Sequence, residues 1–456
     1  MKSATGSKYE IDMCSGPLLG KLISFSVPLM LASNLQLLLN AVDVIVVGNI
    51  RGSHALAAVG STTAYINLLL MFLIGISLGS TVLAGRYFAS GSRRKMEDTV
   101  HTSMMFALLG GIAVALVGIF TSRWVLILMS TPADILDDAV RYIRIFFLGI
   151  PFFMLYTYGA AILRAVGDTK RPLIYLLISG VLNAGLNILL LTVFNMGVEG
   201  VAIATVAAEL LSAVLVIRCL HQSDGTYRLD YGKLRIRPIC LLRILRIGLP
   251  AGTQSLVINF SNALLQASVN TFGANAVAGY TAASNIFGFM YVTANTFTQT
   301  CMSFMSQNFG VRKWGRMLRV LWQCTGLSVA AMLIAGLAVY FFRDPILGIY
   351  SKTPEAIAAG AEVLLYTTTT YFIFALMDLL PGAMRAIGYS SVPMILSVIG
   401  TVGTRIWWIY GVFPHHRALD FLFISYPLSW ILTVAMQVIF FVYAWKKVRA
   451  EASADI

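Results

Sequence analysis

The sequence predicts an all-α membrane protein with about 12 transmembrane helices in two pseudo-symmetric six-helix bundles. The first observation is composition: 58% of the 456 residues are hydrophobic and 12% are charged, whereas about 25% of a soluble domain is charged. The second is an internal repeat: residues 164–172 (RAVGDTKRP) return as residues 385–393 (RAIGYSSVP). Pro28 returns as Pro250, and Thr131-Pro132 returns as Thr353-Pro354. Such a duplication in a very apolar chain is typical of secondary transporters.

The apolar runs are long enough to cross a bilayer, which takes about 20 helical residues. They lack the alternation of outer-membrane strands, so we expect helices. The fourth and tenth spans should include a turn or short helix at the outer surface. The expected spans lie near residues 18–46, 54–84, 99–121, 124–162, 172–194, 197–217, 247–270, 275–309, 320–342, 355–384, 392–413 and 419–445.

The repeat and one long polar linker predict the domain boundaries. We expect an N-terminal tail (1–17), an N-terminal bundle (18–221), a linker (222–239), a C-terminal bundle (240–446) and a C-terminal tail (447–456). Most of the 33 Lys and Arg residues fall in loops on one side of the spans. The positive-inside rule then places both tails and the linker in the cytoplasm, with the spans in the plasma (inner) membrane.

Charge and cysteine content exclude several classes of function. The net charge of +13 is spread over short loops rather than gathered on one face, so we expect lipids and not nucleic acid as partners. The five cysteines show no CxxC pair, and no spacing of His, Ser or carboxylates indicates a catalytic cluster. We therefore expect no enzyme activity, no cofactor and a monomer.

Ionisable residues inside transmembrane spans are candidates for a functional role, because inserting each into the bilayer costs about 2.5–3.5 kcal/mol. Asp43, Asn187 and Thr205 come from three spans, yet each lies about 8–12 Å below the outer end of its span. Asn183 and Glu209 lie one helical turn from Asn187 and Thr205. We interpret these five as a site that couples transport to a cation or a proton. The alternative is that the amides and Thr205 only join helices by hydrogen bonds.

Polar stripes on equivalent helices predict a substrate cavity between the two bundles. Gln36, Asn40 and Asp43 share one face of the first span, and the seventh span has the same spacing. Asp378 either holds a cationic compound there or pairs with Arg405 or Arg385. The predicted cavity residues are Gln36, Asn40, Asn67, Asn259, Asn262, Gln266 and Asp378.

Several motifs resemble the multidrug and toxic compound extrusion (MATE) family. They are the duplicated RAxGxxxxP, the segment from Pro28 to DVIVVG, the run ALAAVGSTTAYINLLLMFLIGISLG and the segment FTQTCMSFMSQNFGVRKWGR. The similarity extends from about residue 17 to 447. It implies two six-helix bundles in a V that open alternately to each side, and efflux of cationic organic compounds driven by inward Na⁺ or H⁺ flow.

The resemblance also points to the coupling site. Prokaryotic members carry an aspartate on the first helix, an Asn-xxx-Asp pair on the fifth and a threonine on the sixth. Asp43, Asn183 and Thr205 match these types, but Asn187 stands where many relatives have aspartate. A bound Na⁺ would take Asp43, Asn183, Asn187 and Thr205, and both Na⁺ and H⁺ stay open as the coupling ion. We expect an antiporter of cationic or amphipathic compounds; the alternative is a lipid-linked saccharide flippase of the same superfamily.

Overall fold

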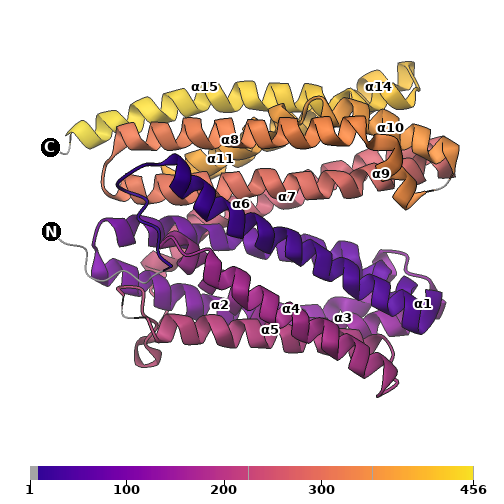
Figure 1. The fold of residues 1–456 in the computed structure, drawn as a ribbon, viewed down its shortest axis with the longest axis horizontal. Coiled ribbons are helices and arrows are strands. Elements are labelled where there is room, and N and C mark those ends of the chain that lie inside the picture. The colour runs from indigo at the N-terminus through magenta and orange to yellow at the C-terminus, as the bar shows by residue number, and fades with distance from the viewer. Residues whose placement is uncertain (1–8, 224, 352, 455–456) are drawn as a thin grey trace. The chain divides into compact units, whose positions relative to one another are not determined.

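The computed structural model describes residues 9–223, 225–351 and 353–454, and within them it is all-α without a strand (Figure 1). The first half of the chain forms α1 (Leu19–Ala89), α2 (Arg93–Leu128), α3 (Ala133–Ala165), α4 (Lys170–Thr192) and α5 (Val198–His221). The second half forms α6 (Pro238–Val269), α7 (Ala274–Gly310), α8 (Trp314–Phe341), α9 (Arg343–Tyr350), α10 (Pro354–Thr368), α11 (Tyr371–Ala386), α12 (Ser391–Ser397), α13 (Thr404–Trp407), α14 (Leu419–Phe423) and α15 (Ser425–Ala454). The predicted fold class is confirmed.

By its internal contacts the chain divides into two units. The N-half comprises residues 9–13 and Val27–Gly248, and the C-half comprises Cys14–Ser26 and residues 249–454. The helices α1 and α6 thus each contribute to both units. The tail, bundle and linker boundaries expected from the sequence stay a prediction.

The internal repeat is visible in the backbone at two pairs of glycines. Gly52 and Gly273 have φ of 80° and 91°, and each lies at a bend between two consecutive spans. Gly167 and Gly388 have φ of 100° and 104° and end α3 and α11. Side chains rarely adopt this left-handed conformation, so glycine is required at all four positions.

The helix count agrees with about 12 spans once the bends are considered. In the described part of the chain, nine helices are long and apolar enough to cross a membrane, or ten if α10 and α11, bent by 54°, form one span. The bend at Gly52 makes two spans of α1. The 37-residue α7 is not among the nine, because its second half is rich in Thr, Ser and Asn.

The third span is longer than predicted. Its helix α2 ends at Leu128, and α3 begins at Ala133, so the expected boundary at residues 121–124 was wrong. Ser130 has φ of 58°, and Pro132 immediately precedes the first turn of α3. The turn therefore lies at Thr131-Pro132, where proline cannot continue a helix, rather than at the polar Thr121–Arg123.

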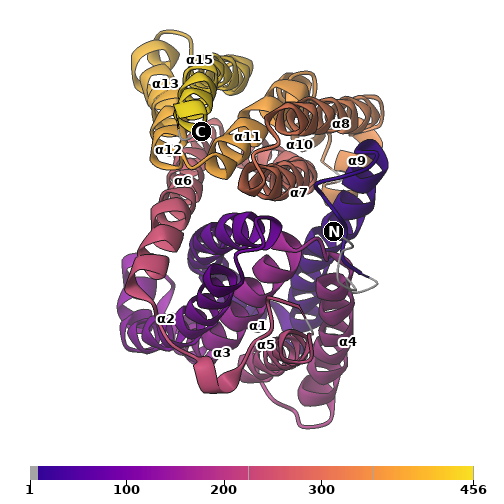
Figure 2. The same ribbon diagram turned by 90° about the vertical axis from the view of Figure 1, so that its left-hand side faces the viewer.

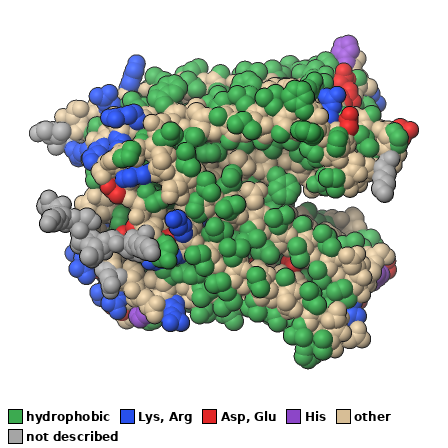
Figure 3. Space-filling view, viewed as in Figure 1, with side chains coloured by type: hydrophobic (Ala, Val, Ile, Leu, Met, Phe, Trp, Pro, Cys, Tyr) green, Lys and Arg blue, Asp and Glu red, His purple; other side chains and the backbone are tan. Residues whose placement is uncertain are grey.

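Each half has its own apolar core. In the N-half α3 packs against both α2 and α5, and α5 packs against α4; Figure 2 shows these helices nearly end-on. In the C-half, aromatic rings on α7, α11 and α15 surround the buried Trp430. On the face shown in Figure 3, hydrophobic side chains cover the middle of each half and Lys and Arg gather at one end. This is the distribution expected of helices that span a bilayer.

Candidate functional site

The N-half joins the predicted coupling residues of α1 and α4. The amide nitrogen of Asn187 donates to Oδ1 of Asp43 over 2.6 Å and lies 3.3 Å from Oδ1 of Asn183. The two asparagines are one turn apart on α4, so their side chains share a face. Asn187 is fully buried, and its Oδ1 has no hydrogen-bond partner among the residues that the structure describes. One acceptor in this cluster is therefore unsatisfied.

The residues predicted on α5 lie apart from this hydrogen-bonded trio. The hydroxyl of Thr205 donates to the carbonyl oxygen of Val201 in its own helix, over 3.0 Å. The carboxyl oxygen Oε2 of Glu209 is buried without a partner among the described residues. It lies against Gly149 of α3, where a Cβ would come within 2.5 Å of it. Glycine at 149 thus leaves the space that this carboxyl group occupies.

Tyr142 is a residue that the sequence reasoning missed. It lies on α3, is 7% exposed and interacts electrostatically with both Asp43 and Glu209. The phenol is thus within electrostatic range of both carboxyl groups. No signal in the sequence indicated this tyrosine, because its proximity to the two carboxyl groups depends on how α3 packs against its neighbours rather than on sequence spacing.

The predicted substrate residues of the N-half all face outward from its core. Gln36, Asn40 and Asn67 are exposed side chains of α1. In the C-half, Asn259 donates to the carbonyl oxygen of Ser255, and Gln266 donates to Asn270. A common cavity formed by these residues stays a prediction.

Asp378 is held by polar side chains of α7. Its Oδ2 accepts from the hydroxyl of Thr298 at 2.7 Å and from the amide of Asn295 at 3.4 Å. Within the described part of the chain, neither Arg385 nor Arg405 comes within 4.0 Å of it, although Arg385 interacts with it electrostatically. The alternative of a direct ion pair with Arg405 is not what the structure shows.

Arg405 instead contacts a second polar group of the C-half. Its Nη1 donates to Oδ1 of Asn262 over 2.8 Å, and its guanidinium carbon lies 4.5 Å from the centre of the Tyr426 ring. Asn262 and Tyr426 also line a pocket of about 310 Å³ together with Gln266, Tyr280 and Phe287. Two of the predicted cavity residues, Asn262 and Gln266, therefore share one pocket.

The donors present offer limited support for a metal ion. In the residues that the structure covers, no group of three His, Cys, Asp or Glu side chains could hold one. The orphaned Oδ1 of Asn187 and the carboxylate of Asp43 are suitable ligands for a hard monovalent cation. The amide nitrogen of Asn187, however, is directed at the oxygens of Asp43 and Asn183. A donor at that position competes with a cation for the same oxygens.

Comparison with known proteins gives the family. The MatE family model matches residues 28–189 and again residues 250–410, one match in each half. The chain is 27% identical over 432 residues to the "Probable multidrug resistance protein YoeA" of Bacillus subtilis, covering 93% of each chain. It is 22% identical over 390 residues to the "Multidrug export protein MepA" of Staphylococcus aureus, covering 84% of this chain and 85% of that protein.

Solved structures show the same fold. The outward-facing conformation of a multidrug resistance MATE family transporter matches with a TM-score of 0.90 at 18% identity, over 98% of this chain and 100% of that one. The two family matches together span most of the sequence and coincide with the internal repeat. The chain therefore belongs to the MatE family, the multidrug and toxic compound extrusion proteins, which are multi-pass membrane transporters and not enzymes.

Proposed function

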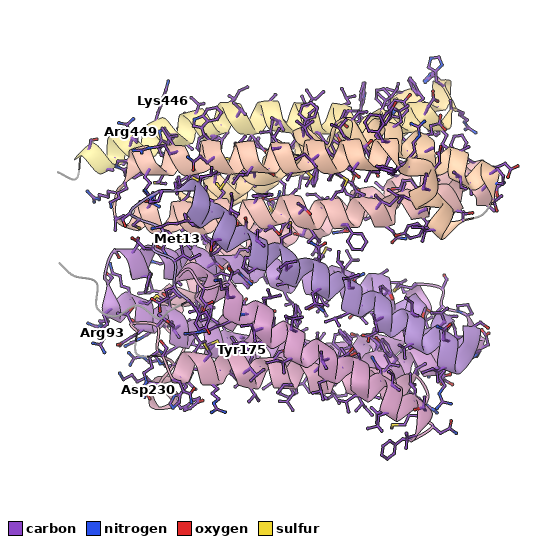
Figure 4. The ribbon with its side chains drawn as sticks, viewed as in Figure 1. Met13, Arg93, Tyr175, Asp230, Lys446 and Arg449 are labelled. Atoms are coloured by element: carbon purple, nitrogen blue, oxygen red, sulfur yellow. The ribbon has the colours of Figure 1, made fainter. Side chains whose placement is uncertain are left out.

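We propose that the protein is a secondary antiporter of the plasma membrane, with both termini in the cytoplasm, that exports cationic or amphipathic organic compounds in exchange for protons. Family membership and relatives described as multidrug proteins support export of small organic molecules. The positive side chains at one end of each half support the orientation. Arg93 lies at this end of the N-half, and Lys446 and Arg449 lie near the end of α15 (Figure 4).

The single observation that carries the choice of the proton is the contact between Asn187 and Asp43. A hard cation is bound by several oxygens that converge on it. Here a nitrogen donor lies 2.6 Å from the Asp43 carboxylate, so one of its oxygens already has a hydrogen-bond donor. With asparagine at 187 in place of a second carboxylate, the trio carries one negative charge. A single proton neutralises that charge, and no further ligands are needed.

Protonation of Asp43 would change the contact rather than only the charge. The ionised carboxylate accepts from the Asn187 amide, whereas a protonated carboxyl group can also donate. The unpartnered Oδ1 of Asn187 is an acceptor for that proton after a half-turn of the amide. The charged and neutral forms of Asp43 thus favour two different arrangements of α1 against α4. Because the proton binds more tightly in one of these arrangements, protonation shifts the equilibrium between two conformations of the transporter.

Sodium is the second candidate coupling ion. The observation in its favour is the buried, unsatisfied Oδ1 of Asn187 close to Asp43, an oxygen pair that a cation could bridge. The flippase alternative is not favoured by the comparisons, because the chain matches multidrug proteins over 93% and 84% of its length. Within the described residues the spans number about twelve, without additional helices.

Transport by purified protein in liposomes tests the proposal. We expect a pH gradient alone to drive movement of tetraphenylphosphonium against its concentration gradient, and a Na⁺ gradient at equal pH to have no effect. Transport driven by the Na⁺ gradient alone would replace the proton with sodium. If neither gradient drives movement of this or another organic cation, the antiport proposal is wrong.

A further inference from the structure

We propose that the pocket beside Arg405 in the C-half is a binding site for aromatic organic anions, such as the carboxylate end of an amphipathic molecule. The proposal concerns binding within one half. Only its consequence for export rests on the proposed function: a molecule with both a cationic and an anionic group would use Arg405 for the anionic one.

The pocket is formed by side chains of four helices of the C-half. Asn262 and Gln266 come from α6, Tyr280 and Phe287 from α7, Thr367 from α10, and Tyr426 from α15. Its volume of about 310 Å³ is at the lower end of the range of roughly 300–1,000 Å³ that small-molecule sites occupy. Three aromatic rings line it together with four polar side chains, and small-molecule sites also combine aromatic rings with placed polar groups. A flat ring with one polar substituent fits this lining.

Arg405 supplies a positive charge directly behind the pocket wall. It lies on α13, which packs against α15 (Figure 2), and its side chain is 3% exposed. Its Nη1 donates to Asn262 over 2.8 Å, and the guanidinium lies over the ring of Tyr426 at 4.5 Å. Both contacts are with residues that line the pocket. The guanidinium is therefore separated from the pocket only by these two side chains, and its positive charge is close enough to attract an anion within the pocket.

The charge of Arg405 has no acidic partner in the described part of the chain. Among the described residues its guanidinium forms no ion pair with an Asp or Glu; Nη1 also lies 3.4 Å from the hydroxyl of Ser261, and Nε is buried without a hydrogen-bond partner there. Asp378, the carboxylate predicted as a possible partner, is bound by Thr298 and Asn295 instead. A buried cation that lacks a counter-charge is costly, and an anion within the pocket would reduce this cost.

The contact with Arg405 also orients Asn262 toward an electron-rich ligand. Because Oδ1 of Asn262 accepts from Arg405, its amide NH₂ is the part of the side chain left to interact with a ligand. A carboxylate in the pocket could accept from this amide, and the nearby guanidinium would stabilise the charge. A cationic group at the same place would face both a donor and a positive charge, so the site discriminates by charge.

Two probes of matched shape and opposite charge test the site. We expect 1-naphthoate to bind to the purified protein in detergent, measured by isothermal titration calorimetry. The affinity for 1-naphthylmethylammonium should be lower by about tenfold or more. Arg405→Met should lower the affinity for 1-naphthoate by about tenfold or more, and Arg405→Lys, which keeps the charge, should lower it less. Equal affinities for the two probes, or an unchanged affinity in Arg405→Met, would overturn the proposal.

Two further variants separate the site from general effects on folding. Arg385→Met removes another buried arginine of the C-half that does not line the pocket, and it should leave 1-naphthoate binding unchanged. Ala283→Leu fills the pocket without altering charge, since Ala283 is a buried lining residue, and it should abolish binding of 1-naphthoate. If Arg405→Met does not fold, two other results test the site. They are the preference of the unmodified protein for 1-naphthoate over the cationic probe and the loss of 1-naphthoate binding in Ala283→Leu. Naphthoate binding without proton-driven export would refute the proposed function but not this site.

Discussion

The amide nitrogen of Asn187 lies 2.6 Å from a carboxylate oxygen of Asp43, and this contact joins α4 to α1 across 144 residues of sequence. Asn187 is fully buried, and within the described part of the chain its side-chain oxygen is unsatisfied. A buried acceptor without a partner costs about 1–3 kcal/mol. Among the described residues the pair is thus held together by one short contact and retains one unused acceptor.

Asp43→Asn tests the coupling role directly. Asparagine keeps the shape of the side chain and can still accept from Asn187, so we expect the variant to fold and to be inserted normally. It cannot bind or release a proton, so gradient-driven transport should fall to the level of protein-free liposomes. Transport of tetraphenylphosphonium under an imposed pH gradient measures this.

A matched control for Asp43→Asn is available on the surface of the N-half. Asp137 pairs with Arg123 at 2.9 Å, and its side chain is 73% exposed. Such an exposed ion pair contributes about 0–1 kcal/mol, so Asp137→Asn should transport like the unmodified protein. Normal gradient-driven transport by Asp43→Asn would show that Asp43 is not the coupling residue.

Asn187→Asp should change the ion dependence of transport. It places a second carboxylate beside Asp43, and two such groups in contact do not ionise together easily unless a cation lies between them. We therefore expect transport by this variant to respond to a Na⁺ gradient, or to have a different pH optimum. Parallel transport measurements with Na⁺ and pH gradients check this, and identical ion dependence in both proteins would contradict it.

Much of the fold could be predicted from sequence because the repeat and the long apolar runs are one-dimensional signals. The left-handed Gly167 and Gly388 follow from the RAxG motif, since a helix that ends before a proline-initiated helix often needs glycine. The end of the third span was placed too early because the polar residues 121–123 interrupt an apolar run, and α2 continues through them to Leu128. Apolar character alone does not determine where one helix ends.

The candidate site was only partly predictable for a physical reason. Helical spacing identifies residues on one face, which is why Asn183 and Asn187 were correctly expected to lie together. Contacts between helices depend on rotation and on small residues such as Gly149, which makes room for Glu209. The position of Tyr142 near two carboxyl groups follows from such packing, and no spacing in a single sequence indicates it.

Glu209 and Tyr142 should affect the rate of transport rather than substrate binding. If Tyr142 and Glu209 pass protons to and from Asp43, both Glu209→Gln and Tyr142→Phe remove a transferable proton and should slow proton-driven export by about tenfold. Equilibrium binding of tetraphenylphosphonium to the same purified variants should stay unchanged. Normal export by Glu209→Gln would mean that this residue serves only to pack α5 against α3.

The corner between α3 and α4 should make stability depend on pH. Burial raises the pKa of Asp168 to about 6, although hydrogen bonds from the backbone of Arg171 and Lys170 and the charge of Arg171 act in the opposite direction. A carboxyl group whose pKa is higher in the folded state contributes stability that is full below about pH 4 and is lost as the pH rises through about 6. Its contribution should therefore decrease between these two pH values.

Asp168→Asn isolates this contribution. The amide oxygen can still accept from the backbone NH groups of Lys170 and Arg171, as Oδ1 of Asp168 does at 3.1 Å. The variant cannot ionise, so its melting temperature should fall less than that of the unmodified protein between pH 4 and 6. Thermal unfolding in detergent across this range measures the difference, and equal slopes would show that Asp168 does not titrate there.

Two adjacent glycines on α2 provide a matched test of helix packing. A Cβ on Gly111 would lie 2.6 Å from the Cα of Pro151, whereas a Cβ on Gly110 would meet its nearest atom at 3.6 Å, an ordinary contact. Gly111→Ala must push α2 away from α3, which should cost about 1–3 kcal/mol. Gly110→Ala should be neutral or stabilise by up to about 1 kcal/mol, because alanine favours a helix more than glycine does. Melting temperatures of the two variants in one detergent check the difference; equal values would mean that α2 and α3 are not in backbone contact at Pro151.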